Sequence, residues 1–126
     1  MKGATGLIII LIMFVDGVVS LAATPCTVIS PACDLTFFDI PPTDYMITLN
    51  EPVDPATVDA SDFTVNRMPA VSVALTNGNI TIIFHFNRSP AVQGTNIMHI
   101  AAGAFNCGFG PVSEFTCKFR FIPSRW

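Results

Sequence analysis

Hydrophobic and polar residues alternate with a period of two along much of the chain after residue 43. The clearest run is at residues 114–121, where every second side chain is a phenylalanine or a cysteine and the others are polar or charged. This alternation is typical of a β-strand with one buried face, which we expect to carry Phe115, Cys117, Phe119 and Phe121. The same period recurs at residues 45–50, 63–65, 71–76, 80–86 and 96–102.

An edge strand at residues 26–30 brings the number of predicted strands to about seven. Residues 23–43 are otherwise expected to be irregular, because they contain Pro25, Pro31, Pro41 and Pro42. No stretch of the predicted domain sustains the 3.6-residue period of a helix. Short strands separated by turn residues predict an all-β fold, an Ig-like antiparallel β-sandwich.

Asn77 and Gly78 lie between two alternating runs and predict a tight β-hairpin. Both central residues of a type I′ turn need a positive φ, which asparagine and glycine tolerate well. In the strand after this turn, we expect the inward side chains to be Ile80, Ile82, Phe84 and Phe86.

Residues 50–66 (NEPVDPATVDASDFTVN) predict the end of one strand, a short helical turn and the start of the next strand. Asp54 can accept a backbone N–H as the N-cap of the turn. Pro55 suits the first helical position, because its missing N–H costs nothing there. With so few residues between two strands, we expect the chain to cross here from one sheet to the other.

Acidic side chains gather in this crossover, and calcium is one interpretation, because hard cations bind several carboxylate oxygens. The residues concerned are Glu51, Asp54, Asp59 and Asp62. Capping of the turn and of the strand start is the interpretation that we favour, since the spacing of an EF-hand loop is absent. The sequence also lacks the zinc spacings and the catalytic motifs of hydrolases and nucleotide-binding enzymes, so His85 and His99 are expected to be outward-facing surface residues.

The N-terminus has the layout of a secretory signal peptide. Lys2 precedes nine apolar residues, Leu7 to Val15, and small residues at Ser20 and Ala22 permit cleavage before Ala23. The apolar run is shorter than the roughly 20 residues of a membrane span. We therefore expect a signal helix in residues 1–22, one domain in residues 23–122 and a tail in residues 123–126. This layout predicts a secreted or cell-surface protein that has no stable membrane span after leader cleavage.

The formal charge of −3 and the scarcity of charged residues, at 12%, give no basic patch, so nucleic acid is not an expected partner. Four cysteines in an exported chain favour disulfides. Cys107 and Cys117 are expected to bond to each other across the last hairpin. The pairing of Cys26 and Cys33 stays open.

The alternating strands leave out several aromatic residues, among them Phe37, Phe38, Phe109 and Trp126. They are expected to cover the ends of the sandwich, and the alternative is that they stack on sugar rings or a partner surface. Asn79 begins a formal glycosylation sequon, but turn chemistry already explains an asparagine at this position.

Three segments resemble the bacterial Ig-like domains of the S-layer (SbsA) type: EPVDPATVDASDFTVN (51–66), MHIAAGAF (98–105) and EFTCKFRF (114–121). The resemblance covers residues 26–121, nearly all of the predicted domain. It implies a β-sandwich that serves as a spacer, an adhesive or an enzyme-appended module, with no catalytic residues to transfer. The chain departs from the family in the aromatic segment 34–40 (DLTFFDI) and in carrying a single copy directly behind a leader.

Together these observations predict a non-catalytic extracellular or cell-surface structural module, part of or derived from a larger secreted protein. No cofactor or metal is expected. The expected partners are neighbouring domains or cell-envelope polymers. The alternative is a carbohydrate or cell-wall binding module appended to an extracellular enzyme.

Overall fold

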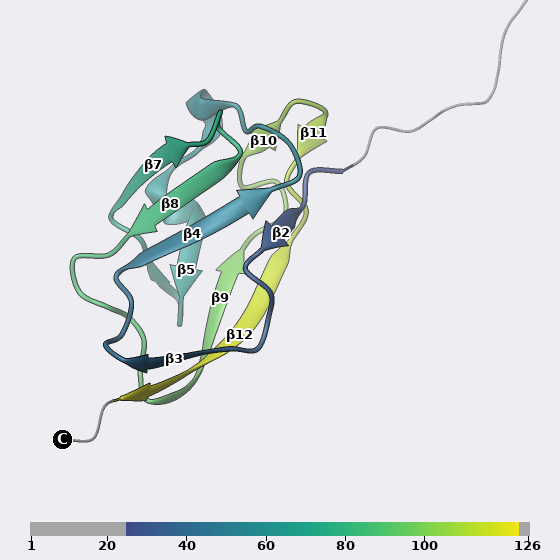
Figure 1. Cartoon of the computed structure of the whole chain (residues 1–126). Helices are drawn as coiled ribbons and strands as arrows, with labels where there is room; N and C mark the ends of the chain where they lie inside the picture. The colour runs from purple at the N-terminus through teal and green to yellow at the C-terminus, as the bar shows by residue number, and fades with distance from the viewer. Residues whose placement is uncertain (1–24, 124–126) are drawn as a thin grey trace, which may run out of the picture.

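The computed structural model of the chain describes residues 25–123, which form two β-sheets and one small hairpin (Figure 1). The four-stranded sheet has the order β2 (Val28–Ser30), β4 (Asp44–Leu49), β8 (Thr81–His85), β7 (Ser72–Thr76). The five-stranded sheet has the order β3 (Leu35–Asp39), β12 (Phe115–Pro123), β9 (Gly94–Ile100), β5 (Phe63–Val65), β6 (Met68–Pro69). The hairpin joins β10 (Asn106–Cys107) to β11 (Gly110–Pro111). The predicted all-β class is confirmed.

The two sheets face each other across one hydrophobic core. Figure 1 shows β4 and β8 in front of β5 and β9. Across the core, the ring of Phe63 in β5 stacks on Phe84 in β8, with centroids 4.8 Å apart and planes 18° from parallel. Tyr45 in β4 contacts both Phe63 and Phe119, at centroid distances of 5.5 and 5.9 Å. Each large side chain buried in this way stabilises the fold by about 1.5–3 kcal/mol.

The alternation read from the sequence is confirmed in the two strands where it is clearest. In β12, Cys117, Phe119 and Phe121 are buried, while the intervening Lys118 and Arg120 are exposed. In and just after β8, the buried residues are Ile82, Phe84 and Phe86.

Thr81 is an exception, because it belongs to the outward set and yet is only 4% exposed. It lies between Thr48 and Thr76 on the neighbouring strands, and its Oγ1 is 3.3 Å from the Oγ1 of Thr48. Neighbouring threonines therefore cover one another on the outer face of this sheet.

The expectation of purely antiparallel pairing is wrong for the five-stranded sheet. Residues 35–39, expected to be irregular, form β3, which pairs in parallel with the end of β12 from Leu35 opposite Phe119 to Asp39 opposite Pro123. After Pro31, a segment without proline leaves β2 at the edge of the four-stranded sheet and adds β3 to the edge of the five-stranded sheet. Parallel neighbours need a long connection, and here it is nearly the whole domain.

The crossover predicted at residues 50–66 is confirmed, since it joins β4 of one sheet to β5 of the other. It contains two 3₁₀ turns, η1 (Pro55–Thr57) and η2 (Ala60–Asp62), where one turn was expected. Asp54 caps the first as predicted, accepting the backbone N–H of Ala56 on Oδ1 at 3.1 Å.

The predicted hairpin joins β7 to β8, and its turn residues have the expected positive φ, 56° at Asn77 and 67° at Gly78. The loop is longer than a two-residue type I′ turn. Thr76 and Thr81 are the last paired residues, and Asn79 also has a positive φ, 68°. The loop therefore has four residues, Asn77 to Ile80.

The predicted signal peptide, residues 1–22, and most of the predicted tail, residues 124–126, lie outside the described residues. Within residues 25–123, no helix is long and apolar enough to cross a membrane.

Candidate functional site

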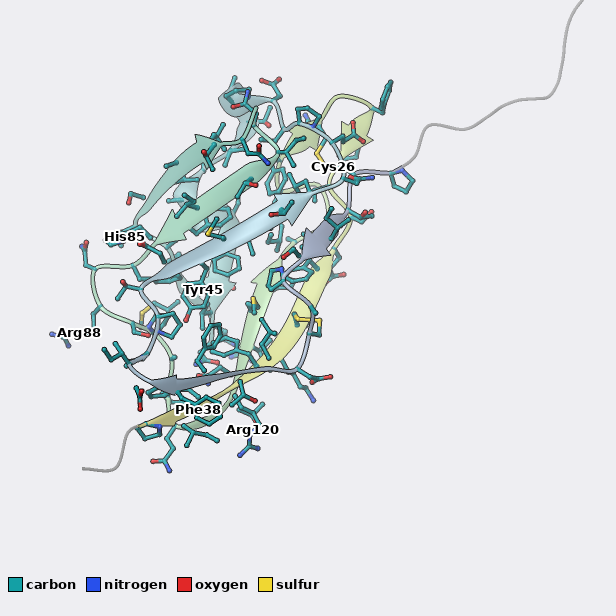
Figure 2. The ribbon with its side chains drawn as sticks, viewed as in Figure 1. Cys26, Phe38, Tyr45, His85, Arg88 and Arg120 are labelled. Atoms are coloured by element: carbon teal, nitrogen blue, oxygen red, sulfur yellow. A yellow bond between two sulfur atoms is a disulfide. The ribbon has the colours of Figure 1, made fainter. Side chains whose placement is uncertain are left out.

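The predicted bond between Cys107 and Cys117 is wrong. Cys107 is bonded to Cys26, with Cα atoms 5.9 Å apart, and Cys117 is bonded to Cys33, with Cα atoms 5.1 Å apart. No cysteine of the described chain is free. Both bonds tie the N-terminal segment, shown by the labelled Cys26 in Figure 2, to the C-terminal part of the domain.

The pairing follows from where the strands after residue 105 go. β10 pairs with β11 and makes one bridge, from Cys107 to Val53, and β12 then leaves this hairpin to pair with β9. Cys107 instead lies beside the N-terminal segment, where the backbone N–H of Ser113 donates to the carbonyl of Cys26 at 2.8 Å. Cys117 lies beside the start of β3, where the N–H of Asp34 donates to the carbonyl of Lys118 at 2.8 Å. Closeness along the chain was therefore a poor guide to closeness in space.

Asp54 and Asp62 accept backbone N–H groups within the crossover, as capping predicts, whereas Glu51 binds outside it, at the β10–β11 hairpin. Asp62 accepts the N–H of Asp59 on Oδ2 at 2.7 Å, and Glu51 accepts the N–H of Phe109 on Oε1 at 3.1 Å. Among residues 25–123, no three Asp, Glu, His or Cys side chains come together as a metal site would require. Burial raises the pKa of the Asp62 carboxyl; the bond from Asp59 opposes this rise, and the Asp59 charge adds to it.

The two histidines occupy the outer faces of opposite sheets, as expected. His85 Nδ1 lies 2.6 Å from Asp44 Oδ1 at one end of β8 (Figure 2), and His99 Nε2 lies 3.1 Å from Glu114 Oε2. Both side chains are partly exposed, at 43% and 39%. These pairs therefore lie at the surface.

The aromatic residues outside the alternating strands divide into covered and exposed ones. Phe37 packs edge-on against Phe119 at 5.5 Å, so covering of the core is confirmed for this residue. Phe38 and Phe109 are 65% and 73% exposed. They lie at opposite ends, since Phe38 is at the lower edge of Figure 2 and the β10–β11 hairpin is at the top of Figure 1. They cannot form one stacking platform. Trp126 lies outside the described residues.

The outer face of the five-stranded sheet carries a group of polar and basic side chains, which we call the basic face. It consists of Thr36, Thr64, Arg67, Thr95, Ile97, His99, Thr116, Lys118 and Arg120, and the exposed Phe38 and Ile122 continue the same side of the sheet past Arg120. Strand register arranges these residues in rows across the sheet. His99 lies between Thr64 and Thr116, and Arg120 lies between Thr36 and Thr95.

The middle row of the basic face brings two cations to either side of Ile97. Lys118 is the partner of Ile97 on β12. On the other side, the β5–β6 turn is bound to β9, because the N–H of Asn66 donates to the Ile97 carbonyl at 2.8 Å. Arg67 follows Asn66 in this turn. Neighbouring strands are about 4.8 Å apart, so the backbones that carry the two cations, on β12 and on the β5–β6 turn, are roughly 10 Å apart.

The basic face is hollowed in two places. A depression of about 390 Å³ is lined by Thr64, Asn66, Arg67, Ile97, His99 and Thr116. A smaller one of about 120 Å³ is lined by Asp34, Thr95, Lys118, Phe119 and Arg120. Three of the four basic residues within residues 25–123 lie on this face, Arg88 being the fourth. The alternation in β12 was a signal for Lys118 and Arg120, but nothing local indicated that Arg67 joins them.

Comparisons with protein-family models, with curated proteins and with solved structures find no match for this chain. The fold and the cystines define an all-β protein with two long-range disulfides, a combination typical of exported proteins. The resemblance to the SbsA-type Ig-like domains stays a prediction from the quoted segments.

Proposed function

We propose that the chain is a non-catalytic structural module of the bacterial Ig-like type, a β-sandwich that is exported to the cell surface or the medium. There it would space or present neighbouring domains of a larger secreted protein. The observation that carries the proposal is the pair of cystines. Each joins the N-terminal segment to the C-terminal part of the domain, across 81 and 84 positions.

Such cross-links suit a spacer, because they limit how far the module can be stretched. A pull on the two ends passes through the disulfides and bypasses most of the chain. The shortest covalent route has seven positions from Cys26 to Cys33 and six from Cys117 to Pro123. At about 3.5 Å per residue, the oxidised module can extend to roughly 50 Å, against more than about 300 Å for the open chain.

Force spectroscopy on the protein held at its two ends tests this role. We expect extensions of about 50 Å or less without reductant, and of more than about 300 Å once dithiothreitol has opened both bonds. Extension beyond about 100 Å in the oxidised protein would argue against a module built to keep its length. Export is tested separately, by sequencing the N-terminus of the protein recovered from the medium, which we expect to begin at Ala23.

A second candidate function is binding of carbohydrate or a cell-wall polymer, favoured by the exposure of Phe38 and Phe109. An exposed ring can stack on a sugar face. We expect Phe38→Ala or Phe109→Ala to abolish retention on a polysaccharide or cell-wall column without changing the denaturation midpoint. Failure of the unmodified protein to be retained would eliminate this candidate.

A further inference from the structure

We infer that the basic face binds an acidic polysaccharide, a polymer of sugars that carry carboxylate groups. The inference rests on the second candidate function, binding of an envelope polymer, and names both the surface and the chemistry of the ligand. It does not use Phe38 or Phe109.

Charge is the first argument. The chain has a formal charge of −3, yet Arg67, Lys118 and Arg120 gather on one face. None of the three has an ion-pair partner among the described residues. The acidic groups at this face are Glu114, which contacts His99, and Asp34, at the rim of the smaller depression. The cations therefore exceed the anions on this face and are free to meet carboxylates.

The groups between the cations fit a sugar chain better than a nucleic acid. Threonine hydroxyls stand in the rows on both sides of Ile97, and they can donate to and accept from sugar hydroxyls. Ile97, 43% exposed, offers an apolar floor to the larger depression. Apart from the His99 ring, no aromatic side chain stands between the cations, and the exposed ring of Phe38 lies past Arg120, beside Ile122, at the edge of the face.

The backbone at Arg67 is the second argument. Asn66 and Arg67 form the two-residue turn between β5 and β6, with φ values of 53° and 70°. Asparagine or glycine fits the second position of such a turn with less strain than arginine. An arginine at this turn position strains the backbone, and it makes no ion pair within residues 25–123 that would offset the strain. Strain of this kind, without a compensating contact, is expected where the side chain serves binding.

This strain gives a variant that separates binding from folding. Arg67→Asn removes a cation and suits the positive φ, so we expect its denaturation midpoint to equal or exceed that of the unmodified protein. The second variant is Lys118→Gln/Arg120→Gln, at two exposed positions of β12. The matched control is Arg88→Gln, which removes the basic residue that lies away from the face, on the loop after β8 (Figure 2).

The test is calorimetric titration with polygalacturonate at low and at 0.3 M salt, with dextran as the neutral polymer and duplex DNA as another polyanion. We expect binding to polygalacturonate that weakens with salt. Arg67→Asn and the β12 variant should each weaken it by about tenfold (about 1.4 kcal/mol), and Arg88→Gln by less than about twofold.

Three results would overturn the inference: no binding to polygalacturonate, an equal loss in Arg88→Gln, or DNA binding as tight as polygalacturonate binding. Binding to dextran that depends on Phe38 or Phe109, with no effect of the basic-face variants, would also overturn it. That last outcome would leave the second candidate function standing.

Discussion

The side-chain amide of Asn66 donates a hydrogen bond to the Oδ1 of Asn96, 2.8 Å away, at the centre of a buried polar cluster. Asn96 is completely buried and uses its whole side chain, since its Oδ1 also accepts the N–H of Val92 and its Nδ2 donates to the carbonyls of Val92 and Gly94. The cluster fastens the loop before β9 to the β5–β6 turn that carries Arg67.

We expect Asn96→Ala to lower the free energy of unfolding by about 3 kcal/mol, because the N–H of Val92 and the amide of Asn66 lose their acceptor inside the protein. Urea denaturation followed by circular dichroism measures this. The control is Asn87→Ala at an exposed position, which should change stability by less than about 0.5 kcal/mol. A similar small effect at Asn96 would mean that the cluster does not stabilise the fold.

Tyr45 is the only tyrosine of the chain, and its hydroxyl is buried with no well-formed hydrogen bond to any described residue. Burial raises the pKa of Tyr45 to about 12, and the nearby Ser89 hydroxyl opposes the rise slightly. A raised pKa means that the folded state holds this proton more tightly than the unfolded state. Its contribution to stability is therefore complete below about pH 10 and is lost as the pH rises from there towards 12.

Absorbance at 295 nm follows this single titration directly. We expect a midpoint near 12 in the native protein and near 10 in guanidinium. Tyr45→Phe should remove the signal and leave stability at pH 7 unchanged or slightly higher, because the hydroxyl that is lost has no good partner. A native midpoint near 10 would show that the hydroxyl reaches water.

The cap at Asp54 can be tested by removing or keeping its acceptor. Asp54→Ala should cost about 1 kcal/mol of stability, because the N–H of Ala56 loses its partner, while Asp54→Asn should cost only a few tenths. Thermal denaturation of the two variants measures the difference. Equal losses in both would indicate that the charge of Asp54, and not its acceptor oxygen, stabilises this turn.

Features that depend on neighbouring residues could be predicted, and features that depend on distant ones could not. The alternation in β8 and β12, the Asn77-Gly78 hairpin and the Asp54 cap are all local. The addition of β3 to β12, the bonding of Cys107 to Cys26 and the burial of Asn96 depend on segments far apart in the chain. The alternation of apolar and polar residues predicted which side chains share a face of a strand, but it did not predict which strands lie beside each other.

The basic face shows the same limit. Lys118 and Arg120 are two residues apart in one strand, so their common face follows from the period of the strand. Arg67 joins them only because the β5–β6 turn hydrogen-bonds to β9. A count of charges over the whole chain, which is negative, hides this local excess of cations.

Loss of a disulfide should be costly, since each closes a loop of more than 80 residues. On the chain-entropy estimate, one such loop is worth about 4.5 kcal/mol. We expect Cys33→Ala/Cys117→Ala to lower the free energy of unfolding by up to this amount, measured in guanidinium. The two loops overlap, so full reduction should cost less than twice as much.

The central claim, that two long-range cystines tie the N-terminal segment to the C-terminal part of an all-β domain, is tested most directly by peptide mapping without reduction. Cleavage after Glu114 separates Cys107 from Cys117, and thermolysin cleavage beside Val28 or Ile29 separates Cys26 from Cys33. Mass spectrometry should then find Cys26 linked to Cys107 and Cys33 linked to Cys117. A peptide in which Cys107 is linked to Cys117 would contradict the account.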